Sequence, residues 1–157
     1  MLDAEARTLL DLMDKAVQEG RPKPHTLPYT VGRAAVDMIL EDGEVDPPEV
    51  AAVEDGALPG PAGKIGYRRY RPPGTSNGSM PTLIYYHGGG FVAGSLETHD
   101  STCRRLANRS GCQVIAIDYR LSPEHPFPAQ TDDGIAAFRH IRENATAFDA
   151  DPTRGRR

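Results

Sequence analysis

A run of β-favouring residues that stops at three consecutive glycines is the feature that most constrains the fold. Thr82–Tyr86 reads Thr-Leu-Ile-Tyr-Tyr, and His87-Gly88-Gly89-Gly90 follows directly. A continuous apolar run of this length is typical of a strand covered on both faces. Adjacent glycines leave backbone N–H groups uncovered and permit φ and ψ values that other residues avoid. The run predicts a buried strand ending in a turn that can aim two donors at one oxygen; the glycines alone leave a flexible turn as the alternative.

The rest of the chain predicts helices first and then alternating strands and helices. Helical periodicity indicates amphipathic helices over residues 2–20 and 30–40, the second with Thr30 as its N-cap, and both are expected to pack as a cover or lid. The further elements are strands at 50–53 and 65–70 joined by the Gly- and Pro-rich residues 58–63, a helix at 97–109 capped by Ser95 or Thr98, a buried strand at 114–117, a Pro-rich loop at 121–128 and a helix at 130–144. From residue 82 onward, this order predicts a parallel sheet flanked by helices.

A second motif also follows a buried strand. Residues 118–129 read Asp-Tyr-Arg-Leu-Ser-Pro-Glu-His-Pro-Phe-Pro-Ala. Together with the earlier His-Gly-Gly-Gly-Phe, and with the stretches at 97–100 and 58–61, this motif resembles the hormone-sensitive-lipase-like branch of the α/β-hydrolase fold. The resemblance covers nearly the whole chain, as far as Thr153.

The resemblance implies a fold class and a division of the chain. It implies the N-terminal half of an α/β-hydrolase fold, a mostly parallel sheet flanked by helices, with cap helices at residues 1–45. Residues 46–157 would then form an incomplete α/β-hydrolase core that ends before the strand carrying the nucleophile.

The resemblance also implies an activity and a site. The family hydrolyses carboxylic esters with a Ser-Asp-His triad, so the expected ligand is a small ester. Gly88, Gly89 and Gly90 would supply the oxyanion-hole N–H groups, with Gly89 and Gly90 as direct donors. His87 would orient this loop rather than exchange protons. Neither a metal nor an organic cofactor is implied.

The triad itself has no counterpart in the 157 residues. The family's nucleophile lies in a Gly-x-Ser-x-Gly elbow between a strand and a helix, with the acid and the histidine later in the chain. Gly74-Thr75-Ser76-Asn77-Gly78 matches the letters, but it follows two prolines and precedes a strand, and Asn-Gly indicates a turn. The polar segment that ends at Arg157 stands where an apolar strand is expected, which predicts a truncation or a frameshift.

Three hypotheses about function therefore stay open. The favoured one is an inactive N-terminal part of a serine carboxylesterase or lipase. The second is a binding protein without catalysis on the same scaffold, as in the plant gibberellin receptors, which resemble this family. The third is a fragment completed by a second chain. Without its neighbouring strand, the apolar run at residues 83–86 would form an exposed sheet edge, which predicts self-association, poor solubility or a molten state.

Composition excludes several other classes. The net charge of −4 gives no basic footprint for nucleic acid, and the three arginines after Thr153 are too few to change this. The longest apolar stretches have about four residues, far fewer than the ~18 of a membrane helix. The first residues are already acidic, which argues against a signal peptide. Cys103 and Cys112 are expected to be reduced thiols in a cytoplasmic protein.

The remaining charged residues near the motifs are expected to have structural roles. These roles are an ion pair between Asp118 and Arg120 that braces the loop, loop anchoring by Glu124 and His125, capping or packing by His99 and Asp100, and a solvated helix start at Asp132 and Asp133.

Overall fold

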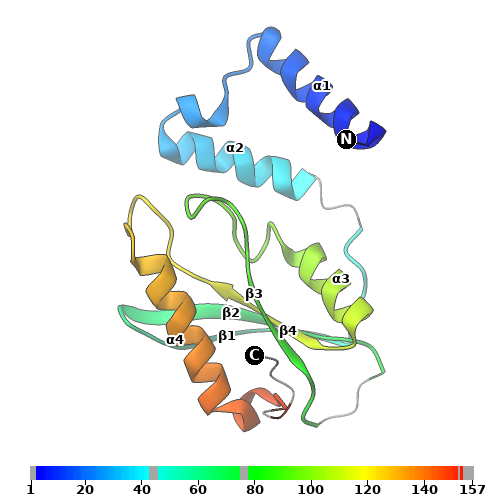
Figure 1. The fold of residues 1–157 in the computed structure, drawn as a ribbon, viewed down its shortest axis with the longest axis vertical. Coiled ribbons are helices and arrows are strands. Elements are labelled where there is room, and N and C mark those ends of the chain that lie inside the picture. The colour runs from blue at the N-terminus through cyan, green and yellow to red at the C-terminus, as the bar shows by residue number, and fades with distance from the viewer. Residues whose placement is uncertain (1–2, 43–45, 75–77, 152, 154–157) are drawn as a thin grey trace.

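The computed structural model describes residues 3–42, 46–74, 78–151 and 153 of the 157-residue chain (Figure 1). Helices α1 (Ala4–Gln18) and α2 (Tyr29–Asp42) come first, with the 3-10 turn η1 (Pro24–Thr26) between them. The elements that follow are β1 (Ala52–Gly60), β2 (Gly63–Arg71), β3 (Thr82–Tyr86), α3 (Asp100–Ser110), β4 (Gln113–Asp118), α4 (Ala129–Glu143) and the 3-10 turn η2 (Ala145–Phe148).

The strands form a mixed sheet in the order β1-β2-β4-β3. β3 and β4 run parallel with Leu83 opposite Val114, and α3 connects them. This confirms the strand–helix–strand unit that the sequence predicts from residue 82 onward. β1 pairs with β2, and β2 with β4, in the antiparallel direction. The parallel pair therefore occupies one side of the sheet.

β3 lies at the outer edge of the sheet, as the sequence predicts for residues 83–86. Its side chains are less exposed than expected, because Leu83, Ile84 and Tyr85 are half-buried and Tyr86 is 40% exposed. Leu83 packs on the α3 side of the sheet and Ile84 on the α4 side. The helices on the two faces thus cover most of the apolar surface of this edge strand.

The core consists of two apolar layers, one on each face of the sheet. Ile115 of β4 is fully buried in a cluster that includes Ile141 of α4. Its neighbour Val114 belongs to a second cluster with Ala107 of α3. Successive side chains of a strand point to opposite faces. Residues 114–117 of the inner strand β4 are therefore all apolar, because α3 and α4 cover both of its faces (Figure 1).

The first two strands are longer than the sequence predicts. β1 and β2 pair continuously from Ala52 opposite Arg71 to Gly60 opposite Gly63. Most of the predicted loop at residues 58–63 is therefore strand, and the loop prediction is wrong there. Pro59 and the glycines are tolerated because β1 is an edge strand, where a missing N–H donor breaks no inner ladder.

Two predicted helix caps are also wrong. Thr30 lies inside α2, which begins at Tyr29. α3 begins at Asp100, with His99 at the N-cap and no side-chain hydrogen bond there. Ser95 and Thr98 instead bond each other in the preceding turn, where the backbone N–H of each donates to the hydroxyl of the other.

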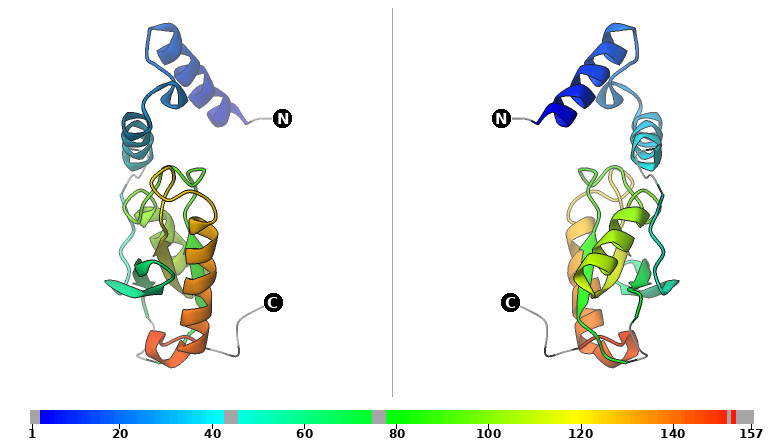
Figure 2. Two further views of the ribbon diagram at one scale, coloured as in Figure 1. Left: turned by 90° about the vertical axis from the view of Figure 1, so that its left-hand side faces the viewer. Right: turned by 90° about the vertical axis from the view of Figure 1, so that its right-hand side faces the viewer.

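Helix α1 does not bury the apolar stripe that led us to expect a packing element. It has no buried residue, and Leu9 and Met13 are 60% and 52% exposed. Both side views place α1 at the end of the molecule, beyond α2 and away from the sheet (Figure 2). The prediction that both N-terminal helices cover an apolar surface is therefore wrong for α1 in the part of the chain that is described.

Candidate functional site

The turn after β3 has a backbone that requires glycine. Gly89 and Gly90 have φ values of 121° and 61°, in the region that L side chains rarely adopt. A Cβ atom on Gly89 would lie 2.0 Å from the carbonyl oxygen of Ala93. The N–H groups of Val92 and Ala93 both donate to Gly89 O at 3.1 Å, which closes the turn.

The glycine amides themselves are unused. In the part of the chain that the structure describes, the N–H groups of Gly88, Gly89 and Gly90 donate to no protein acceptor. All three residues are exposed. Backbone donors held in a fixed turn can bind an oxygen atom that carries or develops negative charge.

His87 is held firmly beside this turn. It is buried, and its ring stacks on the Tyr119 ring with 4.3 Å between the centroids. The Tyr119 hydroxyl donates to His87 O at 2.7 Å, and His87 Nδ1 lies 2.8 Å from Gly88 O. Burial raises the pKa of Tyr119, so that its hydroxyl keeps the proton it donates.

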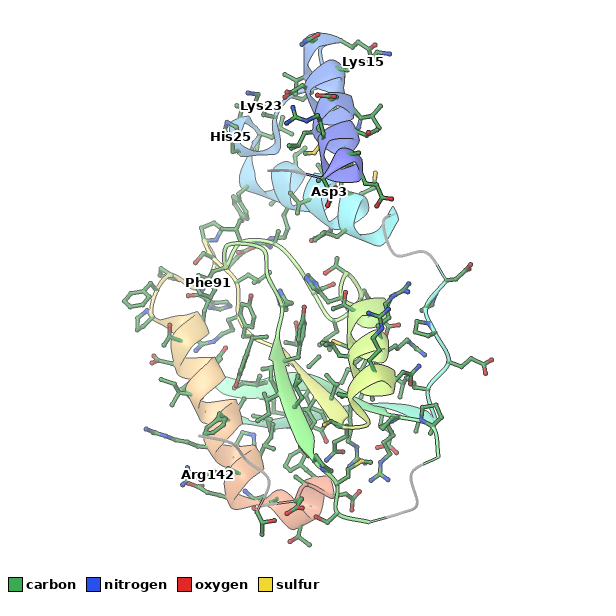
Figure 3. The ribbon with its side chains drawn as sticks, turned by 45° about the vertical axis from the view of Figure 1, so that its right-hand side comes forward. Asp3, Lys15, Lys23, His25, Phe91 and Arg142 are labelled. Atoms are coloured by element: carbon green, nitrogen blue, oxygen red, sulfur yellow. The ribbon has the colours of Figure 1, made fainter. Side chains whose placement is uncertain are left out.

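An apolar cavity of about 410 Å³ opens between this turn, the end of β3 and α4. Tyr86 forms part of its wall and donates its hydroxyl to Gly134 O at 2.8 Å. Phe91 lies at the end of the core that faces α2 (Figure 3). The lining residues are Tyr86, His87, Phe91, Tyr119, Gln130, Thr131, Gly134, Ile135 and Phe138.

Comparison with known proteins decides the family. Residues 83–155 match the sequence profile of a family described as having the alpha/beta hydrolase fold. Esterase LipI of Mycobacterium tuberculosis is 44% identical over 131 residues, which are 82% of this chain and 41% of LipI. Carboxylic ester hydrolase LipN of the same organism is 50% identical over 94 residues, 60% of this chain and 24% of LipN. The chain belongs to the hormone-sensitive-lipase-like α/β-hydrolases.

Solved structures agree with this family. An ester hydrolase from the metagenome of Lake Arreo, complexed with a bipyridine phosphonate derivative, is 68% identical and superposes with a TM-score of 0.94. The match covers 98% of this chain and 49% of that protein. The esterase of Pyrobaculum calidifontis is 37% identical with a TM-score of 0.78, over 92% of this chain and 45% of that protein. The chain thus spans less than half the length of these relatives and structures.

Two residues of α2 that the sequence analysis did not single out contact the glycine loop. Arg33 donates to Val92 O at 2.6 Å and to Ser122 O at 2.8 Å. Asp37 accepts the N–H of Gly94 at 3.0 Å. Their spacing of four residues places both on one side of the helix. That spacing is too common in helices to have identified them beforehand.

The expected ion pair between Asp118 and Arg120 is wrong. Arg120 instead donates to both carboxylate oxygens of Asp133, each at 2.8 Å. Asp133 also accepts the backbone N–H of Arg120 and is only 1% exposed, so its prediction as a solvated residue is wrong as well, whereas Asp132 is exposed. Arg120 reaches the α4 side of the sheet, where a buried carboxylate offers a two-point acceptor.

The structural predictions for Glu124 and Asp100 are confirmed. Glu124 anchors its loop by accepting from Arg33 at 2.8 and 2.7 Å. Asp100 accepts from the Tyr70 hydroxyl at 2.9 Å and from Arg104 at 2.5 Å, so it packs and braces α3. Burial raises the pKa of Asp118, and the nearby His87 opposes that shift.

Several predictions concern what is absent. Residues 75–77 and 154–157 lie outside the described residues, so the turn at the Gly-x-Ser-x-Gly match and the polar end of the chain stay predictions. Among residues 3–42, 46–74, 78–151 and 153, no group of three or more His, Cys, Asp or Glu could hold a metal ion, and no helix could cross a membrane. Cys103 and Cys112 form no disulfide within the same residues.

Proposed function

We propose that this chain forms the oxyanion-binding part of a carboxylic ester hydrolase. The proposal rests on one observation: the unused N–H groups of Gly88–Gly90 lie beside an apolar cavity of about 410 Å³. Ester hydrolysis by a serine nucleophile passes through a tetrahedral intermediate with a negatively charged oxygen. Gly89 and Gly90 would donate to that oxygen directly, and Gly88 would complete the loop. A donor of this kind typically contributes about 10²–10³ in rate.

His87 has a positioning role in this proposal. Its ring is buried against Tyr119, and its Nδ1 faces the carbonyl oxygen of Gly88 within the same loop. A general base must reach the proton that it removes. A buried, stacked ring is better suited to holding the loop than to carrying protons.

The substrate of this site would be a small carboxylic ester. The cavity wall is mainly aromatic and aliphatic, which suits an acyl group. LipI is an esterase, and the Lake Arreo ester hydrolase binds a phosphonate derivative. A tetrahedral phosphonate resembles the intermediate of ester hydrolysis, and enzymes bind such mimics more tightly than substrates.

The nucleophile and its partners would come from residues outside these 157. The single Gly-x-Ser-x-Gly match, at residues 74–78, comes after β2 and is followed by the strand β3, whereas a nucleophile elbow is followed by a helix. We therefore propose cap helices at residues 1–45 and an incomplete hydrolase core at 46–157. The chain by itself should then have no turnover. A serine hydrolase without its triad retains about 10³–10⁴-fold catalysis over water, but only with a complete site.

A fusion protein tests this proposal. Residues 1–151 would be joined to the second half of the Lake Arreo hydrolase, and hydrolysis of a p-nitrophenyl ester compared with that by the chain alone. We expect turnover by the fusion only. Gly89→Ala should lower kcat by about 10²–10³, because the new methyl group displaces the loop. Gly111→Ala is the matched control, since Gly111 also has a positive φ of 66° but ends α3 in open space.

Two outcomes would contradict the proposal. Turnover by the purified chain alone would show that it needs no further residues. Equal kcat values for the fusion and its Gly89→Ala variant would remove the glycine loop from catalysis.

Binding without catalysis is the second candidate function. The cavity beside the glycine turn has an apolar wall, which suits a small apolar ligand. A ligand that binds only the folded chain raises the Tm. A concentration-dependent rise in Tm with a phosphonate ester, absent in Phe138→Asp, would favour this candidate.

We also propose a cytoplasmic location and association through the outer edge of β3. Unpaired strand edges act as templates for further strands. A partner chain carrying the missing strands would use the same edge. Light scattering across a range of protein concentrations tests this, since a monomer with a sharp cooperative melt at every concentration would contradict it.

A further inference from the structure

Helix α2 contacts the glycine loop from outside through polar side chains. Val31, Met38 and Ile39 of α2 are each more than half exposed, whereas Val36 and Leu40 are half-buried. Arg33 binds the backbone at Val92 and Ser122, and Asp37 binds the backbone at Gly94.

The backbone next to one of these contacts is strained. Phe91, which precedes Val92, has a φ of 63°, a sparsely populated conformation for a bulky residue. Such conformations persist only where the surroundings hold them. Phe91 O accepts the N–H of Ser122 at 2.7 Å, and the carbonyl oxygen of the same Ser122 accepts from Arg33. Arg33 therefore connects α2 to the glycine loop through Val92 and to the loop after β4 through Ser122.

Glu124 sets the direction of the Arg33 side chain. It accepts from the two terminal nitrogens of Arg33 at 2.8 and 2.7 Å, while Arg33 Nε donates to Val92 O. A guanidinium group presents its donors in a rigid, planar arrangement. The two hydrogen bonds to Glu124 therefore orient the Nε–H group that donates to Val92 O. The contact with Arg33 lowers the pKa of Glu124 to about 2, and the carboxylate is ionised at neutral pH.

The peptide plane carries this restraint to the proposed donors. Gly89 O accepts from the N–H groups of Val92 and Ala93, and it belongs to the same peptide unit as the N–H of Gly90. In a planar trans peptide the C=O and N–H point in opposite directions. A backbone that is fixed at Val92 therefore also fixes the direction of the Gly90 N–H.

We propose that Arg33 and Asp37 are positioning residues that set the direction of the glycine-loop amides. The effect of these two residues on catalysis depends on the proposed role of the glycine loop in binding the oxyanion. Its structural content stands by itself: removing either side chain should disorder the loop while the sheet stays folded. A role in attaching α2 alone would leave the loop amides unchanged.

Amide NMR of the whole 157-residue chain tests the structural content. In the wild type, the Gly94 N–H should be protected from hydrogen exchange, and Asp37→Asn should lower that protection about tenfold, because an uncharged amide oxygen is a weaker acceptor than the carboxylate. Arg33→Lys keeps the charge but not the planar arrangement of donors. It should lower the order parameter of the Gly90 N–H from about 0.85 toward 0.6.

Internal controls keep the result decisive. Lys15→Ala removes a surface ion pair on α1 and should change none of these signals. The Ile115 amide in β4 reports whether the sheet stays folded in each variant. An unprotected Gly94 amide in the wild type would overturn the proposal. Rigid loop amides in both Arg33→Lys and Asp37→Asn would do so too.

The fusion esterase separates this inference from the proposed function. There, Arg33→Lys and Asp37→Asn should lower kcat with little change in KM, because they move donors that act on the transition state. An inactive fusion together with the expected NMR changes would sink the proposed function and leave the positioning role intact. An active fusion with unchanged kcat in both variants would sink the positioning role.

Discussion

Helices α1 and α4 each have 15 residues and an apolar stripe, yet only α4 buries that stripe. α4 buries Ala137 and Ile141 against the sheet, whereas α1 buries nothing. The difference lies in what faces the stripe, since apolar area stabilises a helix only where another surface removes it from water. In this chain α2 makes polar contacts with the core through Arg33 and Asp37, whereas α4 is held on the sheet by apolar packing.

The largest expected effect tests the core. Leu58 of β1 is 1% exposed and belongs to the cluster on the α4 side. We expect Leu58→Ala to lower the free energy of unfolding by about 2–5 kcal/mol, because a cavity replaces buried methyl groups. Urea denaturation followed by circular dichroism measures this. A change below about 1 kcal/mol would show that the sheet is loosely packed.

A smaller effect is expected at the start of α1. Asp3 caps this helix by accepting the N–H of Ala6 at 2.7 Å. Asp3→Ala should weaken the helix by about 0.5–2 kcal/mol. Because α1 buries no residue, the helical signal should fall while the main unfolding transition stays in place. Thr8→Ala keeps the cap and serves as the control. A shift of the main transition in Asp3→Ala alone would mean that α1 and the core unfold together.

The contrast between the two regions also explains what the sequence could predict. Residues 82–90 could be predicted as a strand and a turn because an apolar β-favouring run and consecutive glycines are local patterns; the burial of the strand could not, since β3 is a half-buried edge strand. The contact of Arg33 with Glu124 joins residues that are 91 positions apart, and no local sequence pattern predicts it. Arg120 likewise binds Asp133, which is 13 residues away, and not its near neighbour Asp118, because the fold places the buried Asp133 carboxylate next to the Arg120 guanidinium.

Strand length and helix caps were missed for a related reason. The β1–β2 hairpin extends through residues 58–60 because pairing with a partner outweighs the low β propensity of Pro59 and Gly60. The exposure of α1 was missed because an amphipathic pattern states which face is apolar, not whether anything covers it. The glycine loop was found early, whereas its outside support on α2 required the structure.

The contact between α2 and the core should respond to acid. Arg33 holds the pKa of Glu124 at about 2, with a smaller contribution from the nearby His125. This lies below the ordinary value of about 4.3. A lowered pKa gives stability that is fully present above the unfolded value and is lost as the pH falls through the folded one. The contact should therefore hold at pH 5 and weaken between about pH 4.3 and 2.

Carbon NMR of the Glu124 carboxyl group measures this titration. The midpoint should be near 2 in the wild type and should rise toward about 4.3 in Arg33→Ala, where the backbone hydrogen bond and the nearby His125 still lower it. Arg104→Ala is the matched control, because it breaks the Arg104–Asp100 ion pair on α3 and leaves Glu124 untouched. Equal midpoints in the wild type and Arg33→Ala would mean that the two side chains are apart in solution.

The smallest effect repeats the core substitution in α1. Leu9 is 60% exposed. Leu9→Ala therefore removes the same atoms as Leu58→Ala, but from a side chain that stays largely in water when the protein folds. The free energy of unfolding should change by less than about 0.5 kcal/mol. Comparing the two variants in one urea series isolates burial, since the substitution is identical. A loss at Leu9 approaching that at Leu58 would show that α1 packs against an apolar surface in solution, and light scattering would tell whether a second copy provides it.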